Sequence, residues 1–172
     1  TVYRDGKEYQ QEFGIGIPKY PVREVGPSGQ RGTKIHFKPD ATIFTTTEYN
    51  YDTLAARMRE LAYLNRGISI AISDERNKDE NGKAFSENFF SQGGLREFVT
   101  FLDKTRQPLI PEVIYMEGTR DNVVVEVAFQ YNDSYNENIH SYVNNINTIE
   151  GGTHVVGFRR ALTRVFKNWA TK

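Results

Sequence analysis

Basic side chains gather at the end of the sequence in a pattern that suits binding to a polyanion. Residues 151–172 hold five lysines and arginines and no carboxylate. On a helical wheel Arg160 and Arg164 fall opposite an apolar arc, and Arg159 lies at its margin. Cations that neutralise phosphates release counterions, so this helix is suited to lie beside nucleic acid. The alternative is an ordinary solvent face, because cations are favoured near a helix C-terminus.

The other chemically competent residues form no recognisable catalytic or metal site. His36, His140 and His154 are far apart, and none belongs to a paired metal-binding motif, so no metal site is predicted. Glu126 lies in an apolar run, and we expect it to be partly buried and paired with a cation rather than catalytic. The Gly-x-Gly at residues 14–16 lacks a third glycine and a following helix, which favours a loop over a phosphate site. No catalytic residue is predicted in this chain.

Composition excludes several classes of protein. The 172 residues suit one domain or two half-domains, and 22 basic residues balance 22 acidic ones, so no net field attracts nucleic acid. The absence of cysteine excludes a disulfide scaffold and cysteine catalysis. Apolar runs are too short to span a bilayer, so we expect a cytoplasmic protein without a membrane partner. Because the sequence starts at Thr1 and its last helical pattern runs into the terminus, we expect a piece of a longer protein.

The periodicity of apolar residues predicts a mixed α+β chain. Helices are predicted over 51–66, with Asn50 as N-cap and Gly67 after its end, over 95–104, and from Thr153 onward. A hairpin with an Asp5-Gly6 turn is predicted at the N-terminus. Further strands are predicted over 33–37, 68–72, 85–90, 113–117, 123–131 and 139–143, with loops over 14–32, 77–83 and 144–152.

Several runs of residues closely resemble one bacterial protein family. The most specific are Asn-Asn-Ile-Asn-Thr-Ile-Glu-Gly-Gly-Thr-His at 144–154 and Gly-Phe-Arg-Arg-Ala-Leu-Thr-Arg at 157–164. Further matching runs lie at 31–40, 59–65 and 126–128, and all the runs have the order and spacing that they have in the family. The sequence therefore resembles the ATPase subunits of type IIA DNA topoisomerases, namely the B subunits of DNA gyrase and of its paralogue topoisomerase IV. The resemblance covers nearly the whole chain.

The resemblance implies an α+β fold made of parts of two domains. Residues 1–92 correspond to the C-terminal half of a GHKL-type ATPase domain, and residues 93–172 to the N-terminal half of a transducer domain that resembles domain 2 of ribosomal protein S5. The family's general-base glutamate, magnesium-binding asparagine and γ-phosphate lysine have no counterpart in this sequence. Phosphoryl transfer needs a positioned water, a metal and a phosphate cradle, so we expect this chain alone not to hydrolyse ATP.

The resemblance also implies nucleotide-contacting residues near the N-terminus. Thr33, after Gly32, matches a threonine that hydrogen-bonds the adenine region and its bound water, and a hydroxyl can both donate and accept. Ile35 matches an apolar residue of the pocket wall on the same strand. Arg4 matches an arginine at the pocket mouth, where aminocoumarin inhibitors stack. Without the resemblance, Thr33 would be an ordinary β-branched strand residue and Arg4 an ordinary hairpin arginine.

Arg159 matches an arginine that lines a cavity for transported DNA, and Arg160 and Arg164 share its helix. The cofactors implied are ATP and Mg²⁺ in the intact enzyme. The partners implied are DNA, a gyrase A subunit in an A₂B₂ heterotetramer, and another copy of the gyrase B chain, with which it dimerises through the ATPase region when ATP is bound. Gyrase is preferred to topoisomerase IV. The other alternative is a stand-alone S5-like nucleic-acid-binding domain, which would have no use for the pocket residues within 1–40.

Overall fold

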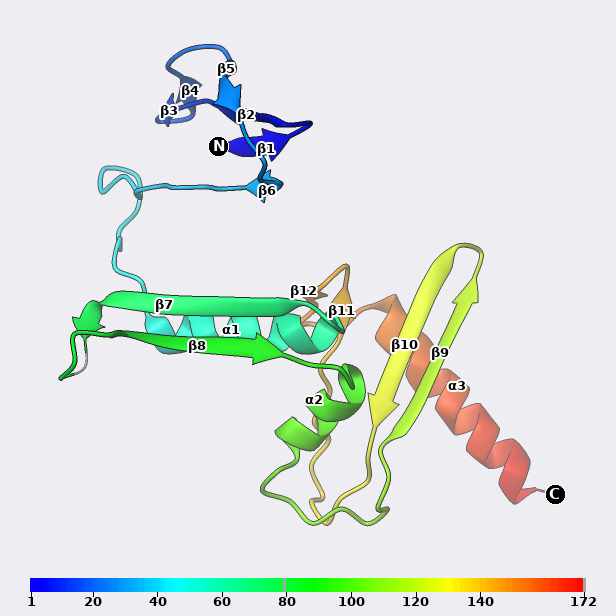
Figure 1. Ribbon diagram of the computed structural model, residues 1–172. Coiled ribbons are helices and arrows are strands. Elements are labelled where there is room, and N and C mark those ends of the chain that lie inside the picture. Colours follow the sequence, from blue (N-terminus) through cyan, green and yellow to red (C-terminus); the bar gives the residue numbers. More distant parts are fainter. Residues whose placement is uncertain (79, 172) are drawn as a thin grey trace. The chain divides into compact units, whose positions relative to one another are not determined.

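The computed structural model describes residues 1–78 and 80–171 and confirms a mixed α+β chain (Figure 1). Its contacts divide it into two compact units, one of residues Thr1–Tyr49 and one that begins at Asn50. The boundary expected between residues 92 and 93 is a different one: it separates the two domains that the family resemblance implies. It stays a prediction. Within the described residues, no helix is long and apolar enough to cross a membrane.

The first unit is built on a four-stranded antiparallel sheet with the strand order β5–β2–β1–β6. The turn between β1 and β2 is Asp5-Gly6, with φ angles of 53° and 77°, which confirms the predicted hairpin. A second, smaller hairpin joins β3 to β4. The strands of this unit are β1 (Val2–Arg4), β2 (Lys7–Gln10), β3 (Phe13–Gly14), β4 (Ile17–Pro18), β5 (Arg23–Pro27) and β6 (Gly32–Thr33).

Two expectations for the first unit are wrong. The segment 14–32 is not all loop, because it contains β4 and β5, and β5 pairs with β2 across a long connection that no local pattern signals. The strand expected over 33–37 ends at Thr33. Lys34 still exchanges backbone hydrogen bonds with Thr1, of 2.8 and 2.9 Å.

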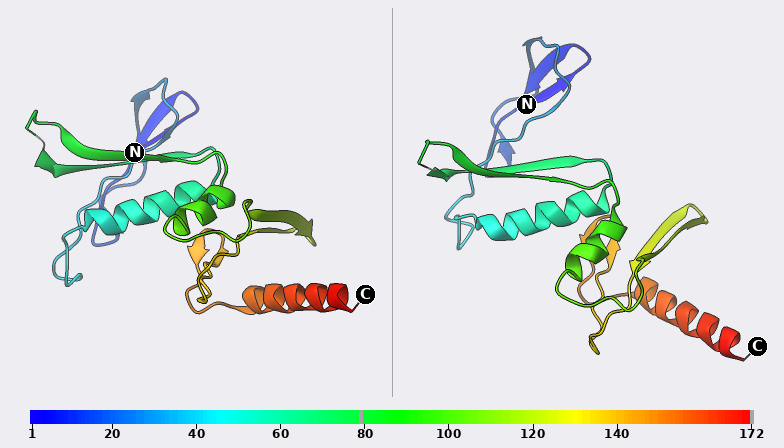
Figure 2. Two further views of the ribbon diagram at one scale, coloured as in Figure 1. Left: turned by 90° about the horizontal axis from the view of Figure 1, so that it is seen from below. Right: turned by 60° about the horizontal axis from the view of Figure 1, so that its bottom comes forward.

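The second unit opens with α1 (Tyr51–Leu64), which lies along a hairpin of β7 (Ser69–Lys78) and β8 (Ala84–Phe90) (Figures 1 and 2). Asn50 caps the helix as predicted, because its side-chain oxygen accepts a 2.8 Å bond from the Thr53 amide. Gly67 has a φ of 82°, as expected after a helix end. The core between helix and hairpin contains Ala55, Ala62 and Phe89. Strand β7 runs beyond the predicted 68–72, because β8 pairs along most of its length.

The rest of the second unit holds two more hairpins and two helices. The turns Asp121-Asn122 and Asn144-Asn145 have positive φ angles, which asparagine and aspartate tolerate. Strand β12 lies within the loop expected over 144–152, and the strand expected over 139–143 covers only β11, because the two short strands pair only with each other. The elements are α2 (Leu95–Leu102), β9 (Ile114–Arg120), β10 (Val123–Phe129), β11 (Tyr142–Val143), β12 (Ile146–Asn147) and α3 (Thr153–Ala170).

A buried serine shapes the turn between β8 and α2. Ser91 is 1 % exposed, and its hydroxyl donates a 2.5 Å bond to Glu97 while it accepts a 2.9 Å bond from the Gly94 amide. The Glu97 carboxylate also accepts a 2.9 Å bond from the Gly93 amide. Behind this turn the ring of Tyr63 on α1 stacks on Phe98 of α2, with centroids 5.1 Å apart. Helix α1 therefore packs against α2 as well as against the β7–β8 hairpin.

Candidate functional site

A pocket in the first unit lies between the β1–β2 turn and the segment that leads into β6. Its cavity volume is about 780 Å³. We call it the N-terminal pocket. Its lining residues are Val2, Tyr3, Arg4, Asp5, Gly6, Ser28, Gly29, Gln30, Arg31, Gly32 and Thr33.

Backbone pairing positions the walls of the N-terminal pocket. Strand β6 pairs antiparallel with β1, which places Thr33 opposite Val2 and Gly32 opposite Tyr3. The amide of Ser28 donates a 2.8 Å bond to the carbonyl of Gly6, so the approach to β6 is tied to the hairpin turn. Gly32 has a φ of 141°, a conformation that a residue with a Cβ rarely adopts. The pocket shape therefore depends on glycine at this position.

The structure brings three of the four predicted nucleotide-contacting residues together. Arg4, Gly32 and Thr33 line the N-terminal pocket. Ile35 does not, and it is 79 % exposed beyond the end of β6. We expected Ile35 to share a strand face with Thr33, and this would need a strand that continues to Phe37. The strand ends at Thr33 instead.

Two arginines give the N-terminal pocket its positive character. Arg31 lines it together with Arg4, and sequence analysis gave Arg31 no role beyond its place in a family motif. Arg4 lies 3.4 Å from the carboxylate of Asp5, and both side chains are exposed. Exposed ion pairs are weak, so this contact leaves Arg4 able to turn toward a ligand. The lining thus combines two arginines with one carboxylate, that of Asp5, and several hydroxyls, and its net positive charge suits a polar, anionic ligand.

A second candidate site is the cationic face of α3. Helix α3 begins at Thr153, as predicted, and Arg159, Arg160 and Arg164 are all exposed on it. Within residues 1–78 and 80–171, neither Arg160 nor Arg164 has an ionic partner. The Arg159 guanidinium lies 2.6 Å from the carboxylate of Glu137. Sequence reasoning missed this pair, because 22 residues separate its members and no pattern links them.

The apolar face of α3 is covered only near its N-terminus. The ring of Phe158 packs edge-on against Phe129 of β10, with centroids 6.1 Å apart. Further along the helix, Val165 and Phe166 are mostly exposed, and Trp169 is 77 % exposed. The cationic face is therefore carried by a helix that is anchored at one end.

Glu126 is partly buried, as predicted, but among residues 1–78 and 80–171 it has no cationic partner, so the expected ion pair is wrong for that part of the chain. Its carboxylate lies 2.8 Å from the hydroxyl of Tyr115 on the neighbouring strand β9, and the carboxylate of Glu117 lies 2.9 Å from the same hydroxyl. Burial, and then the contacts with these two carboxylates, raise the pKa of Tyr115 to about 12. Glu126 therefore has a structural role, but its partner is a neutral hydroxyl on the neighbouring strand.

The histidines take up separate positions in the fold. His154 at the start of α3 contacts the Thr148 hydroxyl through its Nε2 atom, at 3.2 Å. The ring of His140 packs near Phe98, with centroids 6.0 Å apart. In the part of the chain that the structure describes, no three histidine or acidic side chains gather as a metal site would require.

Comparison with known proteins connects both candidate sites to one family. Residues 94–172 match the family model for DNA gyrase B. Over its full length the chain is 59 % identical to the DNA gyrase B protein of Cytophaga hutchinsonii, of which it spans 36 %. It is 50 % identical to the DNA gyrase B protein of Clostridium acetobutylicum over 99 % of its length, and spans 26 % of that protein. The chain thus spans about a third or less of these curated relatives.

Solved structures show the same fold. The 43K ATPase domain of Thermus thermophilus gyrase B, determined in complex with an aminocoumarin, matches 99 % of this chain with a TM-score of 0.80 and 32 % identity. The gyrase B structure from Myxococcus xanthus matches 99 % with a TM-score of 0.81 and 25 % identity. The chain covers 45 % and 49 % of those two structures. Because the similarity includes residues 1–40, which a stand-alone S5-like domain would not need, this chain belongs to the DNA gyrase B family.

Proposed function

We propose that this chain forms part of the ATP-hydrolysing B subunit of a DNA gyrase, which introduces negative supercoils by ATP-driven double-strand passage. In this role it contributes part of the adenine pocket and the transducer wall of the DNA-holding cavity. The observation that carries the proposal is the meeting of Arg4, Gly32 and Thr33 in one pocket, since the family resemblance assigns those three residues to nucleotide or inhibitor contact. The relatives named above are gyrase proteins, which favours gyrase over topoisomerase IV.

The lining of the N-terminal pocket fits one edge of a purine nucleotide. The Thr33 hydroxyl can donate to a ring nitrogen or accept from an amino group, directly or through water. The space beside Gly32 is open, because a Cβ added there would meet nothing within 4 Å. Arg4 at the pocket mouth would stack on an aminocoumarin, the class of molecule bound to the Thermus domain. ATP supplies the phosphoryl group, and the magnesium ligand and the general base would come from parts of the family that these 172 residues do not match.

The cationic face of α3 fits the wall of a DNA cavity. Arg159, Arg160 and Arg164 are exposed side chains suited to phosphates, and phosphate contacts carry no sequence preference. A duplex that must pass through the enzyme is best held in this way. The intact protein would assemble with gyrase A as A₂B₂ and would dimerise through its ATPase region when ATP binds.

The adenine role is tested with Thr33→Val in the complete gyrase B protein. Loss of one hydroxyl contact should weaken nucleotide binding about fivefold to tenfold, measured by calorimetric titration of a non-hydrolysable ATP analogue. Thr46→Val removes an exposed hydroxyl from a segment outside the N-terminal pocket and should leave the affinity unchanged. Equal nucleotide affinities for the two variants would show that Thr33 does not contact the nucleotide. The present chain alone should show no ATPase activity, and magnesium-dependent turnover that persists through purification would contradict the proposal.

The DNA role is tested with Arg159→Gln in the complete enzyme. We expect a larger loss in DNA-stimulated ATP hydrolysis and in supercoiling than in nucleotide binding, because the arginine would contact only the transported duplex. An equal loss in all three measurements would make Arg159 a residue that merely supports the fold.

A further inference from the structure

Arg159, the residue assigned above to the DNA cavity, is already paired within the chain. Its guanidinium lies 2.6 Å from Glu137, and the two side chains are 54 % and 64 % exposed. We propose that Glu137 is an internal competitor for the phosphate groups that Arg159 would contact, and that it thereby weakens the hold of α3 on a duplex. The inference rests on the proposed DNA role of α3 and adds to it the residue that regulates that contact.

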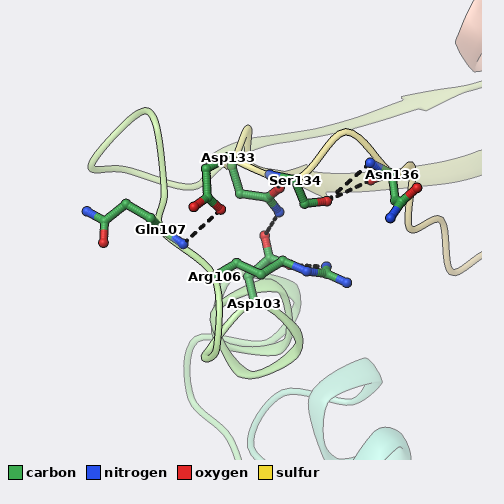
Figure 3. Close-up of polar contacts among 7 residues, drawn as sticks. Asp103, Arg106, Gln107, Asp133, Ser134 and Asn136 are labelled. Atoms are coloured by element: carbon green, nitrogen blue, oxygen red, sulfur yellow. Dashed lines mark hydrogen bonds and ion pairs between the residues drawn. The ribbon is translucent and has the colours of Figure 1, made fainter.

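The segment before Glu137 is held in place by α2 and the loop that follows it. Asp103, at the C-terminal end of α2, accepts a 2.9 Å bond from Arg106 and a 2.8 Å bond from the side-chain amide of Asn132 (Figure 3). The amide of Gln107 donates to the Asp133 carboxylate at 3.2 Å, and the Asp133 amide donates to the Gln107 carbonyl at 3.0 Å. The segment 132–133 is therefore anchored by the side chains of Asn132 and Asp133 and by the backbone bond between residues 107 and 133.

The anchoring continues to the residue next to Glu137. The amide of Ser134 donates a 3.0 Å bond to the side chain of Asn132. The Ser134 hydroxyl accepts a 3.2 Å bond from the amide of Asn136 and lies 3.2 Å from its carbonyl (Figure 3). Glu137 thus directly follows a segment that these hydrogen bonds hold.

The chemistry of this pair favours competition over permanent locking. An ion pair between exposed side chains is weak, so a phosphate can displace the carboxylate from the guanidinium. Displacement has a cost, however, because the ion pair between Arg159 and Glu137 is lost. When the duplex leaves, the anchored carboxylate is in position to pair with Arg159 again. Arg160 and Arg164 have no such competitor among the described residues, so Glu137 acts on one contact of the cationic face.

The proposal predicts a specific change in salt dependence. Each phosphate that a cation neutralises makes the logarithm of the binding constant fall with the logarithm of salt concentration with a slope of about −0.9. In the unaltered chain, the contact of Arg159 with a phosphate releases counterions from the DNA. Part of this release is offset, because the freed Glu137 carboxylate attracts cations from solution. Glu137→Gln removes that offset and the competition together.

The experiment measures binding of this chain to a fluorescent duplex of about 20 base pairs by anisotropy, from about 50 to about 200 mM KCl. Glu137→Gln should bind about threefold tighter at the lowest salt, with a steeper slope. Glu150→Gln is the matched control, because it removes the same charge from an exposed position just before α3. It should change affinity less and leave the slope unchanged.

The double variant Glu137→Gln/Arg159→Gln separates competition from net charge. Because Glu137 acts through Arg159, the double variant should bind more tightly than Arg159→Gln alone only by the small factor that Glu150→Gln shows. A threefold gain that persists without Arg159, or an equal gain in Glu150→Gln, would overturn the competitor role while leaving the DNA role of α3 intact. If the unaltered chain does not bind the duplex at the lowest salt, or if Arg159→Gln binds as tightly, the proposed DNA role fails and the inference fails with it.

Discussion

The side-chain amide of Asn145, in the turn between β11 and β12, donates a 2.9 Å hydrogen bond to the side-chain oxygen of Asn65, the residue that ends α1. The side-chain amide of Asn65 in turn donates a 2.8 Å bond to the carbonyl of Leu61, which fixes the orientation of the acceptor. Eighty residues of sequence separate the two asparagines. The last turn of α1 is thus joined directly to the β11–β12 hairpin.

Two further contacts reinforce this connection. Arg57 donates a 2.5 Å bond to the backbone carbonyl of Asn145, and the hydroxyl of Tyr142 donates to the carboxylate of Glu60. Burial, and then the bond to Glu60, raise the pKa of Tyr142 above its ordinary value. This polar cluster joins α1 to the β11–β12 hairpin, which precedes α3 in the sequence.

The asparagine contact should show as a measurable coupling energy. We expect a double-mutant cycle of Asn65→Ala and Asn145→Gly, followed by urea unfolding, to give a coupling of about 0.5 to 1.5 kcal/mol. Glycine at residue 145 keeps the backbone φ of 66° without strain, and effects outside the pair cancel in the cycle. A coupling near zero would mean that the two side chains act independently.

Gly94 should be hard to replace. Its φ of 60° and ψ of −128° disfavour any side chain, and an added Cβ would lie 2.4 Å from the Cγ of Arg66. We expect Gly94→Ala to lower the free energy of unfolding by about 1 to 3 kcal/mol. Gly118→Ala is the control, because an added Cβ at that strand position meets nothing within 4 Å. Equal urea midpoints for the two variants would contradict the strain argument.

Asp74 should give stability a characteristic acid dependence. The side chain and backbone of Arg76 donate bonds of 2.6 to 3.0 Å to this buried carboxylate, and they lower its pKa from 3.8 to about 2. A lowered pKa means that the folded state prefers the ionised form. The contribution to stability is therefore complete above about pH 4 and is lost as the pH falls toward 2.

The measurement is the urea midpoint of the chain and of Asp74→Asn as a function of pH. The variant should be less stable at neutral pH, and the difference should shrink between pH values of about 4 and 2. Arg76→Gln should weaken the same acid dependence, since it removes the guanidinium donors and keeps the backbone amide. A difference that stays constant over this range would show that the ion pair does not set the pKa of Asp74.

The exposed surface of β10 should promote self-association. Val123, Val124 and Val125 are each more than half exposed, and among the strands that the structure describes β10 pairs with β9 alone. Apolar strands with unpaired edges are prone to add further strands. We expect concentration-dependent oligomers in sedimentation velocity, weakened at least about tenfold by Val124→Lys. Ala56→Lys adds the same charge to the exposed side of α1 and should have little effect. A monomer at high concentration would contradict this prediction.

Local rules account for the parts of the fold that the residues predict correctly. The Asp5-Gly6 turn, the Asn50 cap and the positive φ of Gly67 each depend on the conformational preferences of one or two neighbouring residues. The three helices follow from the periodicity of their apolar side chains, although α1 and α2 each end two residues before the predicted position. The family resemblance then identified Arg4, Gly32 and Thr33, which meet in one pocket.

What the amino-acid sequence determined by itself is the set of helices and tight turns, the cationic face of α3 and the family to which the chain belongs. Only the tertiary structure decided that β5 joins the first sheet, that Ile35 lies outside the N-terminal pocket, and that Glu137 faces Arg159. The physical reason is distance along the chain. Helix periodicity and turn conformation are encoded within a few residues, whereas strand pairing and ion pairing across 22 residues depend on how separate elements pack.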